Sequence, residues 1–186
     1  MPFFIKLRKK WKLLAAGTAL LAALVAGQSQ IQQQIDKVQE KKAAAALRNT
    51  GFGQSLQNAK SKIEGANSLF EMTAEYKSRA EKLEKENGDA WGAYQEAWKN
   101  LDNAEKLLNQ ANIAEIERRV RMFETVSLAF SNLDPAWVDE LASSSRTWIK
   151  LLKKRYEKLK LAISDEKSVI FARIDGIEKR NKAALK

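Results

Sequence analysis

Residues 54–87 read QSLQNAKSKIEGANSLFEMTAEYKSRAEKLEKEN, and this stretch carries the clearest repeating pattern in the chain. Large apolar residues recur every seven positions in two rows, which are Leu56, Ile63 and Phe70 in one and Leu69, Tyr76 and Leu83 in the other. The opposite face carries charge, at Glu71, Glu75, Lys82 and Lys85. This spacing is typical of an amphipathic helix of coiled-coil type. It predicts a helix about 51 Å long.

The next region, residues 90–132, has two apolar stripes that do not share one register. The first consists of Trp91, Tyr94, Trp98, Leu101 and Leu108. The second consists of Ile116, Val120, Phe123 and Phe130. Because the phase slips between the stripes, we predict a bend, a local unwinding or a break at residues 109–112. Trp91, Tyr94 and Trp98 could line a ligand pocket, but core packing between helices explains their spacing better.

Local signals mark where helices end and begin. Asn87 and Gly88 supply a helix end, and Asp89 can cap the next helix. Asp134 followed by Pro135 is the cleanest start signal, because a carboxylate can cap the helix and proline is tolerated at its first position. These signals divide the chain into a helical hairpin over 54–132, made of helices 54–87 and 90–132, and a C-terminal helix or helices over 135–186.

The two outer segments also follow helical spacing. Residues 28–50 are rich in glutamine and carry apolar residues at Ile31, Ile35, Val38 and Ala45. Two glycines, Gly51 and Gly53, predict a turn that ends this helix. Residues 135–186 carry a long stripe, formed by Val138, Leu141, Trp148, Leu152, Leu159, Ile163, Ile170, Ile174 and Ile177. A separate last helix that starts at residues 164–166 is an alternative.

Composition indicates an all-helical protein and narrows its chemistry. The chain has 186 residues, with 8 Gly and only 2 Pro, and neither Cys nor His. Disulfides, thiolate or imidazole metal ligands, and mechanisms that use a His base or a Cys nucleophile are therefore excluded. Short matches to catalytic motifs at 156–160 and 164–167 lack the folds that those motifs require. We expect no enzymatic activity, no catalytic residue, no cofactor and no metal site.

The N-terminus predicts membrane targeting. A basic run, Lys6, Arg8, Lys9, Lys10 and Lys12, precedes fifteen uncharged and mostly apolar residues at 13–27. The positive-inside rule then puts the N-terminus in the cytoplasm and residues 28 onward across the membrane. We expect a single-pass protein with its bulk on the far side. Its anchor residues would be Trp11, Leu13, Leu14, Leu20, Leu21, Leu24 and Val25.

Residues 1–27 nevertheless fit three interpretations. A membrane helix usually needs about 20 apolar residues, so the shorter segment here suits a cleaved signal peptide. Cleavage would make the mature chain secreted or periplasmic. Trp11 at the segment boundary suits an uncleaved anchor instead, because tryptophan is enriched at headgroup level. The third interpretation is a buried or amphipathic helix of a soluble protein.

The net charge of +10 is concentrated at the two ends of the chain. Residues 1–27 carry a formal charge of +5, residues 28–145 carry −3, and residues 146–186 carry +8. The last region contains a basic amphipathic surface, formed by Trp148, Lys150, Lys153, Lys154, Arg155, Lys158 and Lys160. It could contact anionic lipid, nucleic acid or an acidic protein. The simpler alternative is a bundle helix whose apolar side is core and whose lysines face solvent.

The fold expected from these patterns is all-α. A membrane-directed N-terminal helix is followed by long amphipathic helices in an elongated bundle or coiled coil, and the length of the stripes predicts an oligomer. The preferred function is a non-enzymatic, membrane-anchored structural or assembly component of a cell-envelope or virion complex. Its partners would be the membrane and other protein subunits. The alternatives are a secreted subunit of a secretion or conjugation apparatus, and a membrane- or nucleic-acid-binding protein that uses residues 148–160.

Overall fold

The computed structural model describes residues 30–86, 88–127, 129–130 and 133–184, and within them all regular secondary structure is helical. Residues 30–47 form a helix, and the labelled helices follow it as α2 (Gly51–Lys85), α3 (Trp91–Gln110), α4 (Ile113–Ser127) and α5 (Pro135–Ala184). The chain divides into two compact units, Met1–Lys42 and Ala43–Lys186. The all-α class predicted from the sequence is confirmed.

The predicted anchor or signal segment, residues 1–27, lies outside the described residues, and so do its seven anchor side chains. Among the helices that the structure describes, none is long and apolar enough to cross a membrane.

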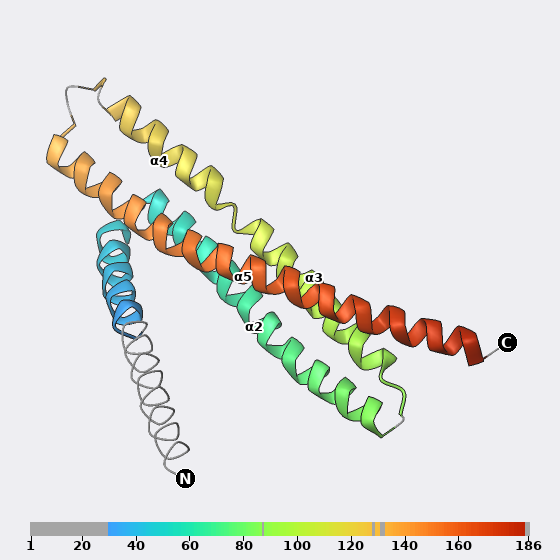
Figure 1. The fold of residues 1–186 in the computed structure, drawn as a ribbon. Coiled ribbons are helices and arrows are strands. Elements are labelled where there is room, and N and C mark those ends of the chain that lie inside the picture. Colours follow the sequence, from blue (N-terminus) through green and yellow to red (C-terminus); the bar gives the residue numbers. More distant parts are fainter. Residues whose placement is uncertain (1–29, 87, 128, 131–132, 185–186) are drawn as a thin grey trace, which may run out of the picture. The chain divides into compact units, whose positions relative to one another are not determined.

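Helices α2 to α5 pack together as a bundle (Figure 1). Helix α2 lies along α3, α4 continues in the direction of α3, and α5 returns beside both of them (Figure 1). Helix α5 contacts α2, α3 and α4. The ends of α2 and α5 therefore meet near the start of α3, whereas the turn between α4 and α5 lies at the other end of the bundle.

The core of the bundle consists of the predicted stripes. Leu56 and Ile63 of α2, Leu101 and Leu108 of α3, and Val120 of α4 are buried. The α5 stripe is buried along most of its length, at Val138, Leu141, Trp148, Leu152, Leu159, Ile163, Ile170 and Ile177. The stripes of α2 to α5 therefore cover one another within a single chain. For α2 to α5, the length of the apolar stripes is therefore not by itself a reason to expect an oligomer.

The predicted phase slip between α3 and α4 is confirmed as a break at residues 111–112. Asn112 has a φ of 45° and is the one non-glycine residue with positive φ in the described part of the chain. Asparagine tolerates this left-handed conformation better than most residues. The break changes the helical phase, so that Leu108 before it and Ile116 after it can both face the core.

The start of α2 differs from the prediction. Gly51 and Gly53 were expected in a turn, but both lie in the first turn of the helix. Thr50 is the cap instead: its hydroxyl accepts a hydrogen bond from the Gly53 N–H at 3.0 Å and donates one to the Leu47 carbonyl at 2.8 Å. The hydroxyl thus ends one helix and begins the next.

The other predicted signals have mixed outcomes. Asp134 accepts a hydrogen bond from the Ala136 N–H at 3.0 Å, and Asp89 accepts one from the Trp91 N–H at 3.0 Å, as expected of capping carboxylates. Helix α5 runs without interruption through 164–166, so no separate last helix starts there. The helix predicted to reach residue 132 already ends at Ser127, and Phe130 is 56% exposed rather than part of a buried stripe.

The approach of Gly53 to Leu47 gives a test of the start of α2. A methyl group at residue 53 would overlap the Leu47 carbonyl oxygen and lie 2.8 Å from its carbon. We expect Gly53→Ala to lower the free energy of unfolding by about 1–3 kcal/mol, as overpacking does. Urea unfolding followed by circular dichroism measures it.

The matched control is Gly51→Ala, two residues away in the same turn. A Cβ atom at residue 51 would have no neighbour within 4 Å. This variant should be as stable as the wild type or more stable by about 0.5–1 kcal/mol, because alanine favours helix over glycine. Equal stability of the two variants would contradict the packing at Gly53.

Candidate interaction surfaces

The basic region of α5 is divided between the core and the surface of the bundle. Trp148 is 2% exposed and Leu152 is fully buried, so the apolar side of the predicted basic amphipathic surface packs inside. On the outer side, Lys150, Lys153, Lys154, Lys158 and Lys160 are exposed and Arg155 is half-buried. Trp148 therefore lies in the core, whereas the lysines that the sequence analysis assigned to the same surface lie on the outside of the bundle.

Basic residues of α5 pair with acidic residues on the neighbouring helices. Arg146 pairs with Glu124 of α4, and Lys153 lies 3.4 Å from Glu117 of the same helix. Part of the positive charge of residues 146–186 is thus opposed by acidic residues of α4, in pairs that stay partly exposed to solvent. The high charge of this region does not by itself indicate a binding surface.

Lys167 is the most extensively paired of these cations. Its ammonium group pairs with Glu105 and lies 3.4 Å from Asp102, both on α3. It also lies 5.3 Å from the centre of the Trp98 ring, within cation–π range. These charges raise the pKa of Lys167 against the opposing effect of burial, which is the largest single influence on it. The side chain is only 18% exposed and fastens α5 to α3.

A second polar cluster joins the ends of three helices. The Tyr94 hydroxyl of α3 donates a hydrogen bond to Glu84 of α2 at 3.1 Å. Glu84 also pairs with Arg180 at 3.2 Å and Arg173 at 3.8 Å, both on α5. Burial, followed by the bond to Glu84, raises the pKa of Tyr94 to about 12. Sequence reasoning missed this cluster, because Glu84 and Arg180 are 96 positions apart.

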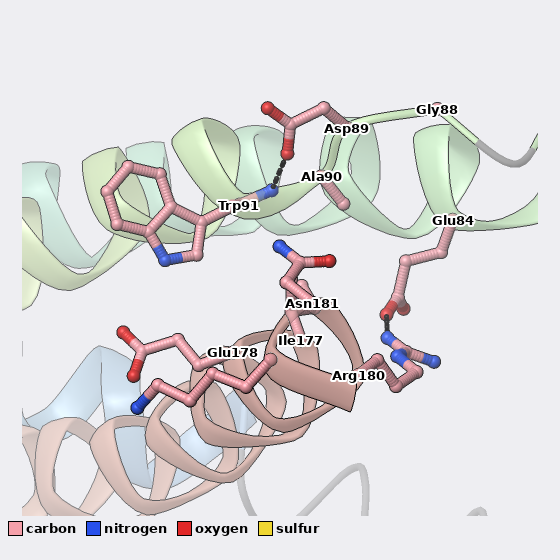
Figure 2. Close-up of a pocket in the computed structure, with 10 residues that line it drawn as sticks. Glu84, Gly88, Asp89, Ala90, Trp91, Ile177, Glu178, Arg180 and Asn181 are labelled. Atoms are coloured by element: carbon pink, nitrogen blue, oxygen red, sulfur yellow. Dashed lines mark hydrogen bonds and ion pairs between the residues drawn. The ribbon is translucent and has the colours of Figure 1, made fainter. Parts of the chain in front are cut away.

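An open cleft of about 850 Å³ lies beside this cluster (Figure 2). It is bounded by the α2–α3 turn at Gly88 and Asp89, by Trp91, and by the end of α5. Figure 2 shows Asn181 of α5 pointing toward the start of α3 and the Arg180–Glu84 pair at one side. The lining mixes acidic, basic and amide groups, which favours no single class of ligand. Within the described residues, no group of three or more acidic side chains is placed to hold a metal ion.

Large apolar side chains are exposed at single positions of α2 and α5, at Met72, Leu161, Val169 and Phe171, and in two larger groups. One surrounds the turn between α4 and α5 and includes Met122, Val126, Phe130, Leu133 and Trp137. The other is a row on the helix 30–47, where Ile31 is 62% exposed, Ile35 44% and Val38 52%. The second group lies on one continuous helix, at the intervals of four and three by which one helix packs along another, whereas the first spans the end of α4, the turn and the start of α5. We call Ile31, Ile35 and Val38 the open stripe.

Comparison with protein-family models, with curated proteins and with solved structures finds no match.

The Lys167 cluster predicts a specific loss of stability. We expect Lys167→Met to lower the free energy of unfolding by about 1–2 kcal/mol, because it removes two ion pairs and a cation–π contact from a largely buried position. The control is Lys150→Met, an exposed position of the same helix, which should change stability by less than about 0.5 kcal/mol. Chemical denaturation measures both, and equal losses would contradict the special role of Lys167.

The Tyr94–Glu84 bond predicts a loss of stability at high pH. Folding raises the Tyr94 pKa from an unfolded value of 10.0 to about 12, so the folded state holds this proton more tightly. The stabilisation from this proton is complete below pH 10.0 and is lost as the pH rises toward about 12. Tyr94→Phe should remove this part of the pH dependence and cost about 1–2 kcal/mol at neutral pH.

The free energy of unfolding is measured from pH 8 to 12 for the wild type and for Tyr94→Phe. Lysine titration affects both proteins equally, so it cancels in the difference between their free energies. Tyrosine absorbance should also show one of the three tyrosines ionising late in the wild type and none late in the variant. Parallel stability curves for wild type and variant would contradict the assigned bond.

Proposed function

We propose that this chain is a non-enzymatic, membrane-anchored structural component of a cell-envelope or virion assembly that acts through helix–helix contacts. Residues 13–27 would anchor it in the bilayer, and the basic residues before them would stay on the cytoplasmic side. Residues 28 onward, including the α2–α5 bundle, would lie on the far side of the membrane. This architecture would present the bundle as a rigid body attached to a lipid surface.

The open stripe is the observation that carries this proposal. The stripes of α2 to α5 are covered within the bundle, whereas Ile31, Ile35 and Val38 remain exposed a few residues after the apolar segment. Burial of each side chain against a partner helix would contribute about 1.5–3 kcal/mol relative to full exposure. The stripe therefore supports a role in which another helix covers this surface close to the membrane.

The alternative role of residues 148–160 in binding lipid or nucleic acid has less support. Insertion of this helix into a bilayer interface would use its apolar face, but Trp148 and Leu152 are already in the core. Such insertion would require the bundle to open. Contacts to phosphate groups would have to come from the exposed lysines alone, and Lys153 already pairs with Glu117.

Membrane extraction tests the anchor. We expect the full chain to stay in the membrane pellet after sodium carbonate and after high salt, and to be released by detergent. The double variant Leu20→Lys/Leu21→Lys should move to the supernatant, since each lysine at the centre of a membrane segment costs about 2.5–3.5 kcal/mol on insertion scales.

The matched control is Leu161→Lys, which adds a lysine at a leucine that is 65% exposed on α5. It should stay in the pellet with the wild type. Release of the wild type by carbonate alone would contradict the anchor. Mass spectrometry of the purified chain supplies a second readout, because a mature N-terminus at Gln28 would replace the anchored component with a secreted subunit.

A further inference from the structure

We infer that the end of α5 opens and closes as a unit of its own while the rest of the bundle stays folded, and that Glu84 of α2 is the contact that holds it closed. We call residues 171–184 the terminal segment. This inference goes beyond the proposed function, because it concerns residues of the bundle alone and does not depend on the anchor. Three observations support it: the sparse burial of the segment, the convergence of its ion pairs on one carboxylate, and its place beside the cleft.

The terminal segment buries little apolar surface. Up to Ile170, which is fully buried, the stripe of α5 is buried along most of its length. Beyond Ile170, within the part of α5 that the structure describes, Ile177 is the one buried side chain, and it is 7% exposed. Ile174 is half-buried, whereas residues 171–173 and 178–183 are exposed. Segments with few buried contacts open at a lower free energy than the core of the same protein.

The ion pairs of the terminal segment converge on Glu84. The guanidinium group of Arg180 lies 3.2 Å from its carboxylate, and that of Arg173 lies 3.8 Å from it. Arg173, Ile177 and Arg180 follow one another at intervals of four and three, so they share one face of the helix. The buried isoleucine and both arginines therefore dock together, and removal of one carboxylate removes both pairs.

The other contacts of the segment do not replace Glu84. Lys179 pairs with Asp175 at 2.7 Å, but both residues belong to α5. The ring of Phe171 lies 6.1 Å from the ring of Trp98 on α3, although Phe171 remains 61% exposed. Among the described residues, Glu84 is thus the one acidic partner on another helix that pairs with the segment.

Glu84 itself stays in place when the segment opens. It lies in the last turn of α2, and its side chain is 21% exposed. The hydroxyl group of the buried Tyr94 donates a hydrogen bond to it at 3.1 Å. This bond joins α2 to α3 and does not involve α5. The carboxylate therefore remains oriented toward the arginines, which lowers the entropy cost of closing again.

The terminal segment forms one wall of the cleft beside the α2–α3 turn (Figure 2). Ile177, Glu178 and Asn181 line the cleft from α5, opposite Gly88 and Trp91. Opening of the segment removes this wall and exposes the side chain of Ile177, so access to the cleft depends on the segment. Because the two arginines are 56% and 70% exposed, dissolved salt screens their pairs with Glu84. Higher ionic strength should therefore favour the open state.

Hydrogen–deuterium exchange of the full chain in detergent tests the inference, with mass spectrometry of peptides from 138–170, 171–177 and 178–184. Glu84→Gln removes the charge but keeps an oxygen that can accept the Tyr94 hydrogen bond. It should speed exchange in both terminal peptides by the same factor, about threefold to tenfold, and leave 138–170 unchanged. Raising the salt concentration from about 0.1 M to about 1 M should have the same effect on the wild type and little effect on the variant.

The matched control is Glu86→Gln, which removes the same charge two residues further along the chain. Glu86 is 59% exposed and pairs with Lys82 at 3.9 Å within the same end of α2. This variant should change exchange in the terminal segment by less than about twofold. Ile177→Ala supplies a second test. It should speed exchange in the segment more than Glu84→Gln does, because it removes the one buried side chain, and it should keep the response to salt.

Four results would each overturn the inference. Equal acceleration of 138–170 and 171–184 in Glu84→Gln would mean that the bundle opens as a whole. A larger effect on 178–184 than on 171–177 would mean gradual fraying instead of opening as a unit. No effect of Glu84→Gln, or an equal effect of Glu86→Gln, would mean that Glu84 does not hold the segment. None of these results bears on the anchor, which carbonate extraction tests separately.

Discussion

Burial of the apolar face of α5 against α2, α3 and α4 is the interaction on which the bundle depends. The helix has 50 residues, and its buried row runs from Val138 to Ile177. A helix gains little stability from intrinsic propensity alone, so most of it comes from covering the apolar stripe. Each buried Leu, Ile or Trp contributes about 1.5–3 kcal/mol, which exceeds what any single polar contact on the surface of α5 can add.

The ion pairs of α5 have a different role. Exposed pairs contribute about 0–1 kcal/mol each, so they do not hold the bundle together. They join particular helices, Lys153 to α4 and Arg180 to α2, while the largely buried Lys167 joins α5 to α3. Apolar stripes with similar spacing could pack in more than one alignment, whereas these pairs favour one. The basic C-terminal region and the acidic residues before it are thus parts of one structure, which reduces the charge left for an external partner.

The helix pattern was largely predictable because it depends on local spacing and capping. The stripes, the slip at 109–112 and the start at Pro135 are all visible in short windows of sequence. Gly51 and Gly53 were assigned wrongly because glycine usually ends helices, yet here the Thr50 hydroxyl starts one and Gly53 makes room for the Leu47 carbonyl. The exposure of Phe130 was missed because periodicity does not reveal that α4 stops at Ser127.

The sequence by itself determined that the chain is helical, where most of its helices begin and end, and which residues lie on one face of each helix. It also determined the basic and apolar character of residues 1–27 and the heptad spacing of the open stripe. Only the tertiary structure decided which faces are covered. Trp148 is buried although it stands among lysines, and Ile31 is exposed although its spacing is that of core residues. Burial depends on contacts between residues far apart in the chain, and local periodicity carries no information about those contacts.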